Sequence, residues 1–159
     1  MTSPSAAPRA TGAAPQTAAA HAATPRAVAL AAALDAALVV VFAVIGRSSH
    51  AEGLDLPGVF GTAWPFLVGT LLGWLVVRAW RAPFALWPMG VVVWATTVIV
   101  GMLLRAASGQ GTAVAFIIVA TITVAVLLLG WRGIALLVGR LRGRGARDAA
   151  SDRTGTPAS

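Results

Sequence analysis

The sequence predicts an all-α protein, a four-helix transmembrane bundle with disordered N- and C-terminal tails. The first observation is four long apolar segments, at residues 27–46, 58–77, 87–104 and 112–139. Each is long enough, or nearly so, to cross a hydrocarbon core of about 30 Å at about 1.5 Å per helical residue. The second observation is that 58% of the 159 residues are hydrophobic and only 11% are charged, whereas a soluble domain carries about 25% charged residues. We therefore expect a multi-pass protein of the cytoplasmic membrane.

The two ends of the chain lack the apolar content of its centre. Residues 1–26 are rich in Ala, Thr and Pro, and residues 140–159 are polar and rich in arginine. Segments of such composition have little to bury in a core, so both are expected to be disordered tails. The transmembrane domain between them occupies residues 27–139.

The first half of this domain is expected to form one helical hairpin. The first helix covers residues 27–46, and the polar segment 47–57 joins it to the second helix, residues 58–77. Pro65 lies in the first turns of that second helix, where the loss of a backbone N–H is least harmful.

The second half repeats this plan. A short turn at residues 78–83 leads into the third helix, residues 87–104, and a turn at 105–111 leads into the fourth, residues 112–139. Arg132 is the one charged residue of the fourth apolar segment. The even number of helices places both ends of the chain on one side of the membrane.

The arginines predict which side that is. All 12 basic residues are arginine, and the net charge is +7. One side of the predicted bundle carries only Arg47 and Arg105. The other, which holds both tails, carries Arg9, Arg26, Arg78, Arg81, Arg140, Arg142, Arg144, Arg147 and Arg153. Cytoplasmic segments retain the excess of positive charge, so both termini are expected in the cytoplasm.

The basic and aromatic residues also predict partners. Because the arginines cluster at the ends of the helices and in a tail, we expect contact with anionic lipid headgroups and not with nucleic acid. Four tryptophans fall near the inner boundary, where membrane proteins carry an aromatic belt. These are Trp74, Trp80, Trp87 and Trp131.

Composition excludes several kinds of chemistry. Cysteine is absent, so disulfides, thiolate metal sites and cysteine nucleophiles are excluded. No GxSxG, HExxH or P-loop motif occurs, and lysine is absent. We therefore name no catalytic residue, no cofactor and no metal ligand, and nothing specific favours an enzyme.

Asp35 is the most informative residue of the sequence. It lies about nine residues, or about 13 Å, into the first helix. A carboxylate at that depth costs about 3 kcal/mol or more unless it is paired or protonated. Arg132 lies at a matching depth in the fourth helix if that helix continues to Arg140, so we predict an Asp35–Arg132 contact. The pair then serves either as a proton- or cation-linked relay or as a contact that fixes helix packing.

A second geometry stays open for these two residues. The fourth helix could end at Trp131, with residues 133–139 lying along the membrane interface. Arg132 would then bind lipid phosphates, and Asp35 would need threonine or backbone partners.

A polar cluster is predicted at the outer end of the bundle. It comprises Arg47, His50, Glu52 and Arg105, with Asp55 close by in the sequence. Imidazole and carboxylates are common metal ligands, but this spacing matches no metal motif and the ligand set is incomplete. The two arginines could cap helix carbonyls, pair with the acids, attract an anion, or anchor the helices at the interface.

Small residues predict close helix contacts. Gly69 and Gly73 form a GxxxG motif on the second helix, which favours close packing either within one chain or between two copies. Leu71-Leu72-Gly73-Trp74 recurs as Leu128-Leu129-Gly130-Trp131, a faint internal repeat. Two tandem hairpins would explain it, and so would chance similarity between apolar helices.

Several segments together resemble DUF3054, a family of small bacterial and archaeal membrane proteins of unknown function. The similarity extends from about Ala27 to Leu137. The segments that carry it are Leu34-Asp35, Gly46-Arg47-Ser48-Ser49-His50, Thr62-Ala63-Trp64-Pro65-Phe66, Gly101-Met102-Leu103-Leu104-Arg105, Gly111-Thr112-Ala113 with Phe116, and Leu129-Gly130-Trp131-Arg132. The resemblance implies four helices and an integral membrane location, and it implies no activity.

Three classes of function remain open from the sequence. The first is a small transporter- or channel-like protein that assembles as a homo-oligomer, because four short helices enclose little space. The second is a non-catalytic scaffold or accessory subunit of a membrane complex. The third is a membrane enzyme that uses His50 and its acidic neighbours. The substrate is not specified by the sequence.

Overall fold

The computed structural model describes residues 23–49 and 55–154, and these residues form helices and turns without a strand. The long helices are α1 (Pro25–Ser49), α2 (Leu56–Val77), α3 (Val91–Ala107) and α4 (Val114–Thr154). A short 3-10 helix, η1 (Ala79–Arg81), and a kinked segment, η2 (Leu86–Gly90), in which Trp87 is extended, connect α2 to α3. The predicted all-α class with four apolar helices is confirmed.

Four helical segments are long and apolar enough to cross a membrane. Their bounds are Pro25–Ser48, Leu56–Val77, Leu86–Ala107 and Val114–Gly145, with mean hydropathies of 2.7, 1.6, 1.8 and 2.6. Large apolar side chains point away from the bundle on each helix, such as Leu71 on α2 and Leu103 on α3, which are 60% and 64% exposed. Lipid would cover such a surface far more favourably than water.

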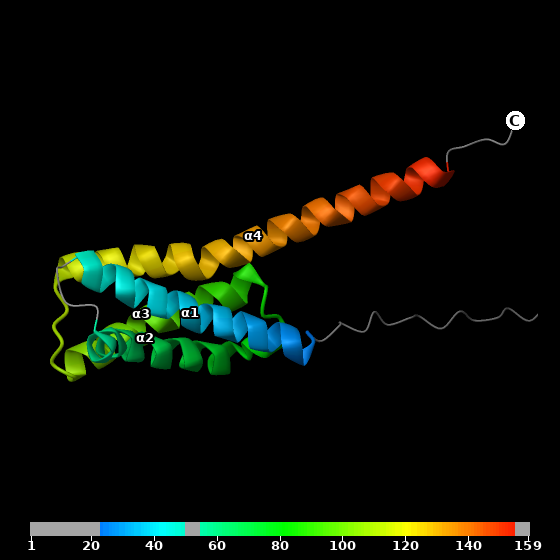
Figure 1. Cartoon of the computed structure of the whole chain (residues 1–159). Coiled ribbons are helices and arrows are strands. Elements are labelled where there is room, and N and C mark those ends of the chain that lie inside the picture. Colours follow the sequence, from blue (N-terminus) through cyan, green and yellow to red (C-terminus); the bar gives the residue numbers. More distant parts are fainter. Residues whose placement is uncertain (1–22, 50–54, 155–159) are drawn as a thin grey trace, which may run out of the picture.

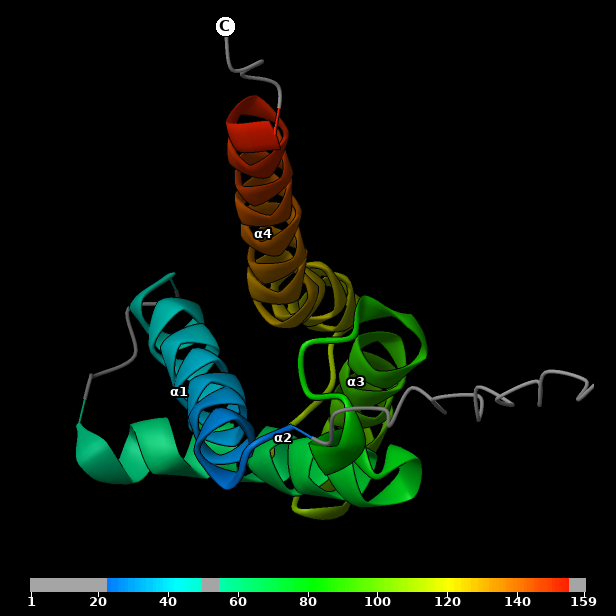
Figure 2. The ribbon, with the colours of Figure 1, turned by 90° about the vertical axis from the view of Figure 1, so that its right-hand side faces the viewer.

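The helices form one bundle in which α2 and α3 share the most extensive contact. Helix α1 packs on α2 and α4, and α4 also packs on α3. The start of α1 and the end of α4 lie on the same side of the bundle (Figure 1). Seen from that side, the four helices surround a common centre, and α2 crosses below the others (Figure 2).

The GxxxG motif of α2 lies against α3 of the same chain. A Cβ atom on Gly69 would stand 2.8 Å from the carbonyl oxygen of Thr97, and one on Gly73 would stand 2.9 Å from the Cα of Val93. Next to this contact, the hydroxyls of Thr70 and Thr97 are hydrogen-bonded at 3.0 Å. The small residues therefore bring the two backbones together within one chain, as small residues do in membrane helices.

Aromatic rings fill the bundle near the end where α1 stops and α2 starts. Phe42 and Phe66 meet edge to face with ring centroids 5.0 Å apart, and Phe116 lies 6.4 Å from the first and 6.5 Å from the second. Phe66 is completely buried. Gly101 of α3 makes room for it, because a Cβ atom there would overlap the Phe66 ring.

Helix α2 has a well-defined beginning. Asp55 is its N-cap, and one carboxylate oxygen, Oδ2, accepts a hydrogen bond of 3.0 Å from the backbone N–H of Gly58. Such a cap satisfies a backbone donor that the helix itself leaves open. Pro65 lies inside α2, where a proline favours a bend of the helix, and its side chain is buried in the bundle.

The C-terminal segment differs from its prediction. We expected residues 140–159 to be a disordered tail, but α4 continues to Thr154 and leaves the bundle as a helix (Figure 1). Arginine, alanine and leucine are strong helix formers, and extending an existing helix needs no new nucleus. The basic residues at the end of α4 therefore extend a helix that the apolar residues before them have already formed. At the other end of the chain, α1 begins at Pro25, two residues before the predicted start of the domain.

Candidate functional site

Asp35 of α1 and Arg132 of α4 form a bidentate ion pair inside the bundle. Nη1 of Arg132 donates to Oδ1 of Asp35 at 2.8 Å, and Nη2 donates to Oδ2 at 2.7 Å. Both side chains are 0% exposed. A fork-to-fork arrangement of this kind is the strongest form of a charged hydrogen bond. The structure thus places the two predicted residues in direct contact, with the fourth helix continuing past Arg132.

Two tryptophans complete the surroundings of the carboxylate. The indole N–H of Trp74 donates to Oδ2 of Asp35 at 2.8 Å, and that of Trp131 donates to Oδ1 at 2.9 Å. Each oxygen of Asp35 therefore accepts one bond from the guanidinium and one from an indole. Such bonds stabilise a charged carboxylate, which would otherwise be costly so far from water.

The guanidinium is held from its other side by the α2–α3 connection. Nε of Arg132 donates to the carbonyl of Pro83 at 3.2 Å, and Nη1 also donates to the carbonyl of Leu128 at 2.9 Å. Gly90 provides space, because a Cβ atom there would stand 2.8 Å from Cδ of Arg132. Contacts from α1, α2, α4 and the connection together enclose the pair.

The structure differs from the prediction in the orientation of two tryptophans. Trp74 and Trp131 were expected in an aromatic belt at the inner boundary, whereas the structure directs both indoles inward to Asp35. The faint internal repeat distinguished these two tryptophans from the others, because each copy of Leu-Leu-Gly-Trp ends on one of them. Two tryptophans at matching depths can bind one carboxylate from two helices.

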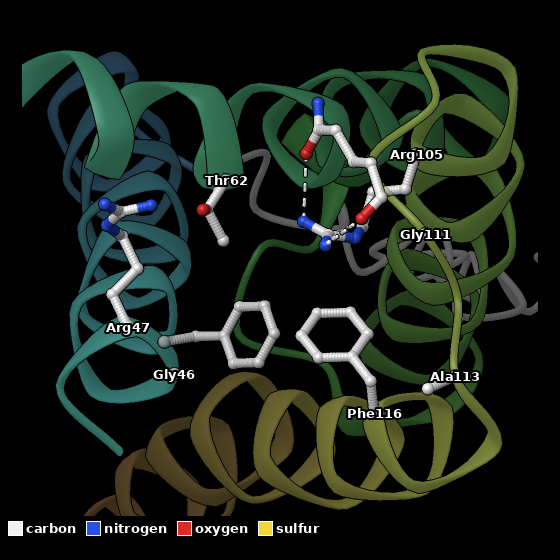
Figure 3. Close-up of a pocket in the computed structure, with 9 residues that line it drawn as sticks. Gly46, Arg47, Thr62, Arg105, Gly111, Ala113 and Phe116 are labelled. Atoms are coloured by element: carbon white, nitrogen blue, oxygen red, sulfur yellow. Dashed lines mark hydrogen bonds between the residues drawn. The ribbon is translucent and has the colours of Figure 1, made fainter. Parts of the chain in front are cut away.

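A pocket of about 320 Å³ opens at the end of the bundle where α1 stops and α2 starts. We call it the arginine pocket. Its lining consists of Phe42, Gly46, Arg47, Thr62, Arg105, Gln110, Gly111, Ala113 and Phe116. Arg47 and Arg105 lie at opposite sides of it, with Thr62 between them and Phe116 below (Figure 3). The structure thereby brings together two of the four residues predicted for the outer cluster.

Arg47 is positioned by the start of α2. Its Nη2 pairs with Oδ1 of Asp55 at 3.2 Å, while the other oxygen of Asp55 caps the helix. A Cβ atom on Gly58 would overlap the Arg47 guanidinium, so that glycine leaves the space in which the cation lies. His50 and Glu52, the other two predicted members of the cluster, lie outside the described residues.

Arg105 is positioned by the α3–α4 turn. Nη1 donates to the side-chain oxygen of Gln110 at 3.0 Å, and Nη2 donates to its backbone carbonyl at 3.3 Å (Figure 3). The guanidinium carbon lies 4.4 Å from the centroid of the Phe116 ring. A cation stacked on an aromatic face and anchored at two points is held in a fixed orientation.

The chemistry of the pocket follows from its lining. Arginine and hydroxyl groups donate hydrogen bonds, and no carboxylate of the described residues belongs to the lining. Such a site suits a ligand that accepts hydrogen bonds and carries negative charge. Among the described residues, no group of three histidine, cysteine, aspartate or glutamate side chains is placed to hold a metal ion.

Comparison with known proteins identifies a family. A family model described as a protein of unknown function, DUF3054, matches residues 32–135. That range contains both halves of the buried ion pair and the whole lining of the arginine pocket. No curated protein and no solved structure matches the chain.

Proposed function

The chain belongs to the DUF3054 family, whose function is unknown, and from its geometry we propose a transporter-like membrane protein that binds an anionic group in the arginine pocket. The observation that carries the proposal is that pocket. Two guanidinium groups from different helices face a space of about 320 Å³, and within the described part of the chain its lining contains no acidic side chain. This volume is at the lower end of the range of about 300–1,000 Å³ in which small-molecule sites fall.

The proposal places all four helices across the cytoplasmic membrane, with both termini in the cytoplasm. The apolar lengths and the shared side of the start of α1 and the end of α4 support this topology, and so does the excess of arginine on that side. The arginine pocket then opens on the outer face. The basic end of α4 meets the anionic lipid headgroups of the inner face.

The buried ion pair is not the path of the proposed transport. Both of its side chains are sealed, and Asp35 lies about two helical turns, or about 10 Å, from Phe42 along α1. The packed rings of Phe42, Phe66 and Phe116 occupy the bundle at the pocket. We therefore propose that the protein assembles from several copies and that a conducting path runs between them.

Anion binding is tested with the full chain in neutral detergent. Inorganic phosphate at millimolar concentration should raise the melting temperature relative to chloride at equal ionic strength. Arg105→Gln should remove that response, and Arg105→Lys should weaken it, because lysine cannot present two parallel donors. Arg81→Gln, which changes an exposed arginine of η1 outside the pocket, is the matched control and should respond like the parent protein. A parent protein that melts identically in phosphate and chloride would overturn the proposal.

Transport is tested separately, by uptake of labelled phosphate into proteoliposomes. The parent protein and Arg81→Gln should both exceed empty liposomes, whereas Arg105→Gln should not. A phosphate-dependent melting shift without uptake would restrict the function to binding.

A non-transporting scaffold or accessory subunit is the second candidate function. The observation that favours it is the sealed Asp35–Arg132 pair, which fixes α1 against α4, together with the apolar side chains on the outer surface. If this function holds, Asp35→Asn reduces expression and assembly, and no separable activity is lost with it.

A further inference from the structure

A second cavity, of about 200 Å³, adjoins the arginine pocket. We call it the α1–α4 groove, because its lining comes from those two helices and the residue that leads into α4. It is lined by Phe42, Ile45, Gly46, Ala113, Ala115, Phe116, Val119 and Thr123. Phe42, Gly46, Ala113 and Phe116 belong to both cavities. The two spaces therefore share one wall, to which Gly46 contributes from α1.

The groove is apolar and faces outward. Among the described residues that line it, Thr123 alone has a polar side chain. Ile45 and Val119 are 47% and 59% exposed, so the groove reaches the surface that the bilayer covers. An apolar groove that opens sideways into lipid is accessible to a hydrocarbon chain without passage through water.

The arginine pocket and the groove differ in what they would bind. The pocket presents the guanidinium groups of Arg47 and Arg105 and the hydroxyl of Thr62. A single guanidinium fork already satisfies a carboxylate, whereas a phosphate has further oxygens that can accept bonds from a second cation and a hydroxyl. Asp55 pairs with Arg47, and the lining also holds a second guanidinium, that of Arg105.

Building on the proposed anion site, we infer that its ligand is a membrane lipid whose headgroup is a phosphate monoester. The headgroup lies between Arg47 and Arg105, and one hydrocarbon chain follows the α1–α4 groove past Val119. The lipid enters from the side, between α1 and α4. A soluble phosphate would occupy the pocket alone and would gain nothing from the groove.

Native mass spectrometry of the full chain in neutral detergent tests this inference. Three probes are compared: lysophosphatidic acid, lysophosphatidylcholine and inorganic phosphate. The single-chain lipid with the phosphate monoester should bind with one-to-one stoichiometry and at least about tenfold more tightly than either of the others. About tenfold is what the burial of roughly two methylene groups supplies, and a longer contact gives more.

Gly46→Leu separates the tail from the headgroup. A Cβ atom on Gly46 meets nothing within 4 Å, so leucine can be placed there, and its side chain would fill the junction of the two cavities. We expect this variant to lose about tenfold in affinity for lysophosphatidic acid while its melting shift with inorganic phosphate is unchanged. Gly61→Leu is the matched control, because Gly61 is also an open helical glycine and lines neither cavity. Val119→Trp fills the groove from α4 and provides a second variant if Gly46→Leu fails to elute as a folded protein.

The outcomes are distinguishable. Equal binding of lysophosphatidic acid and inorganic phosphate, unaffected by Gly46→Leu, would overturn the lipid inference and leave the anion site in place. Equal binding of the two lysolipids would show apolar adsorption only and would also overturn it. No response to any phosphate-bearing probe would overturn the proposed function itself.

Discussion

The carboxylate of Asp35 and the guanidinium of Arg132 stand 97 residues apart in the sequence and are joined by hydrogen bonds of 2.8 and 2.7 Å. With the indoles of Trp74 and Trp131 bound to the same carboxylate, the pair links three of the four long helices. The pair and its two indole donors therefore connect α1, α2 and α4 at one point in the bundle.

Breaking the pair from one side should be costly. Asp35→Asn leaves Arg132 buried without its counterion, and removing one partner of a buried ion pair costs about 3–5 kcal/mol. We expect a large fall in the melting temperature in detergent. The double variant Asp35→Leu, Arg132→Leu removes both charges and should recover much of the loss, because buried pairs are often replaceable by apolar residues. If Asp35→Asn is as stable as the parent protein but loses ion-coupled flux in proteoliposomes, the proton-relay hypothesis is correct instead.

The two indole donors should each contribute measurably. Trp74→Phe and Trp131→Phe keep the aromatic volume approximately but remove one hydrogen bond to a charged group, worth about 1.5–3 kcal/mol. Trp87→Phe is the control, because Trp87 is 76% exposed. Thermal unfolding should rank both inner variants below this control. Equal stability of all three variants would mean that the indole bonds contribute nothing.

The α2–α3 contact should be sensitive to single methyl groups. Gly69→Ala and Gly73→Ala push the new methyl against the backbone of α3, and overpacking of this kind costs about 1–3 kcal/mol. Gly61→Ala is the control, because a Cβ atom there meets nothing within 4 Å. Thermal unfolding in detergent measures the loss, and light scattering measures the number of copies. A change in copy number without loss of stability would instead place this motif between chains.

Asp55 should lower the affinity of the arginine pocket for phosphate. Asp55→Asn retains a good N-cap for α2 but removes the negative charge paired with Arg47. Because exposed ion pairs contribute about 0.2–1 kcal/mol, the affinity for phosphate should rise about two- to fivefold. Asp55→Ala should show the same gain with about 1 kcal/mol less stability, since it also removes the cap. Titration of the phosphate-dependent melting shift measures both effects, and weaker binding in Asp55→Asn would contradict the expected role.

The topology can be tested by single cysteines, because the chain has none of its own. Ser108→Cys lies at the exposed end of α3, and Arg81→Cys lies in η1 near the opposite end. A membrane-impermeant maleimide should label the first in intact cells and the second only after permeabilisation. The reverse pattern would place both termini outside and the arginine pocket in the cytoplasm.

The sequence alone predicted the helices and the match in depth between Asp35 and Arg132. Hydrophobic length determines the number of helices in a membrane, and an acid at mid-depth needs a partner at the same depth. The rotation of each helix about its axis depends on packing, and so the inward direction of Trp74 and Trp131 could not be obtained from their positions alone. For the same reason, the sequence left open whether Gly69 and Gly73 face α3 or a second chain.

The arginine pocket was predictable only in part. Arg47 and Arg105 end two apolar segments at the same face, which predicts their proximity. Their orientation depends on local contacts that no spacing specifies, namely Asp55 with Arg47 and the stacking of Arg105 on Phe116. The α1–α4 groove depends on how far those helices diverge, which is set by the side chains of the whole bundle.

The position of the ion pair has a consequence for biogenesis. Asp35 belongs to the first helix and Arg132 to the last, so during synthesis the acid is inserted long before its counterion has been made. A chain that stops before α4 would leave this carboxylate without the guanidinium that pairs with it. The ion pair can therefore form only after nearly the whole helical domain has been synthesised.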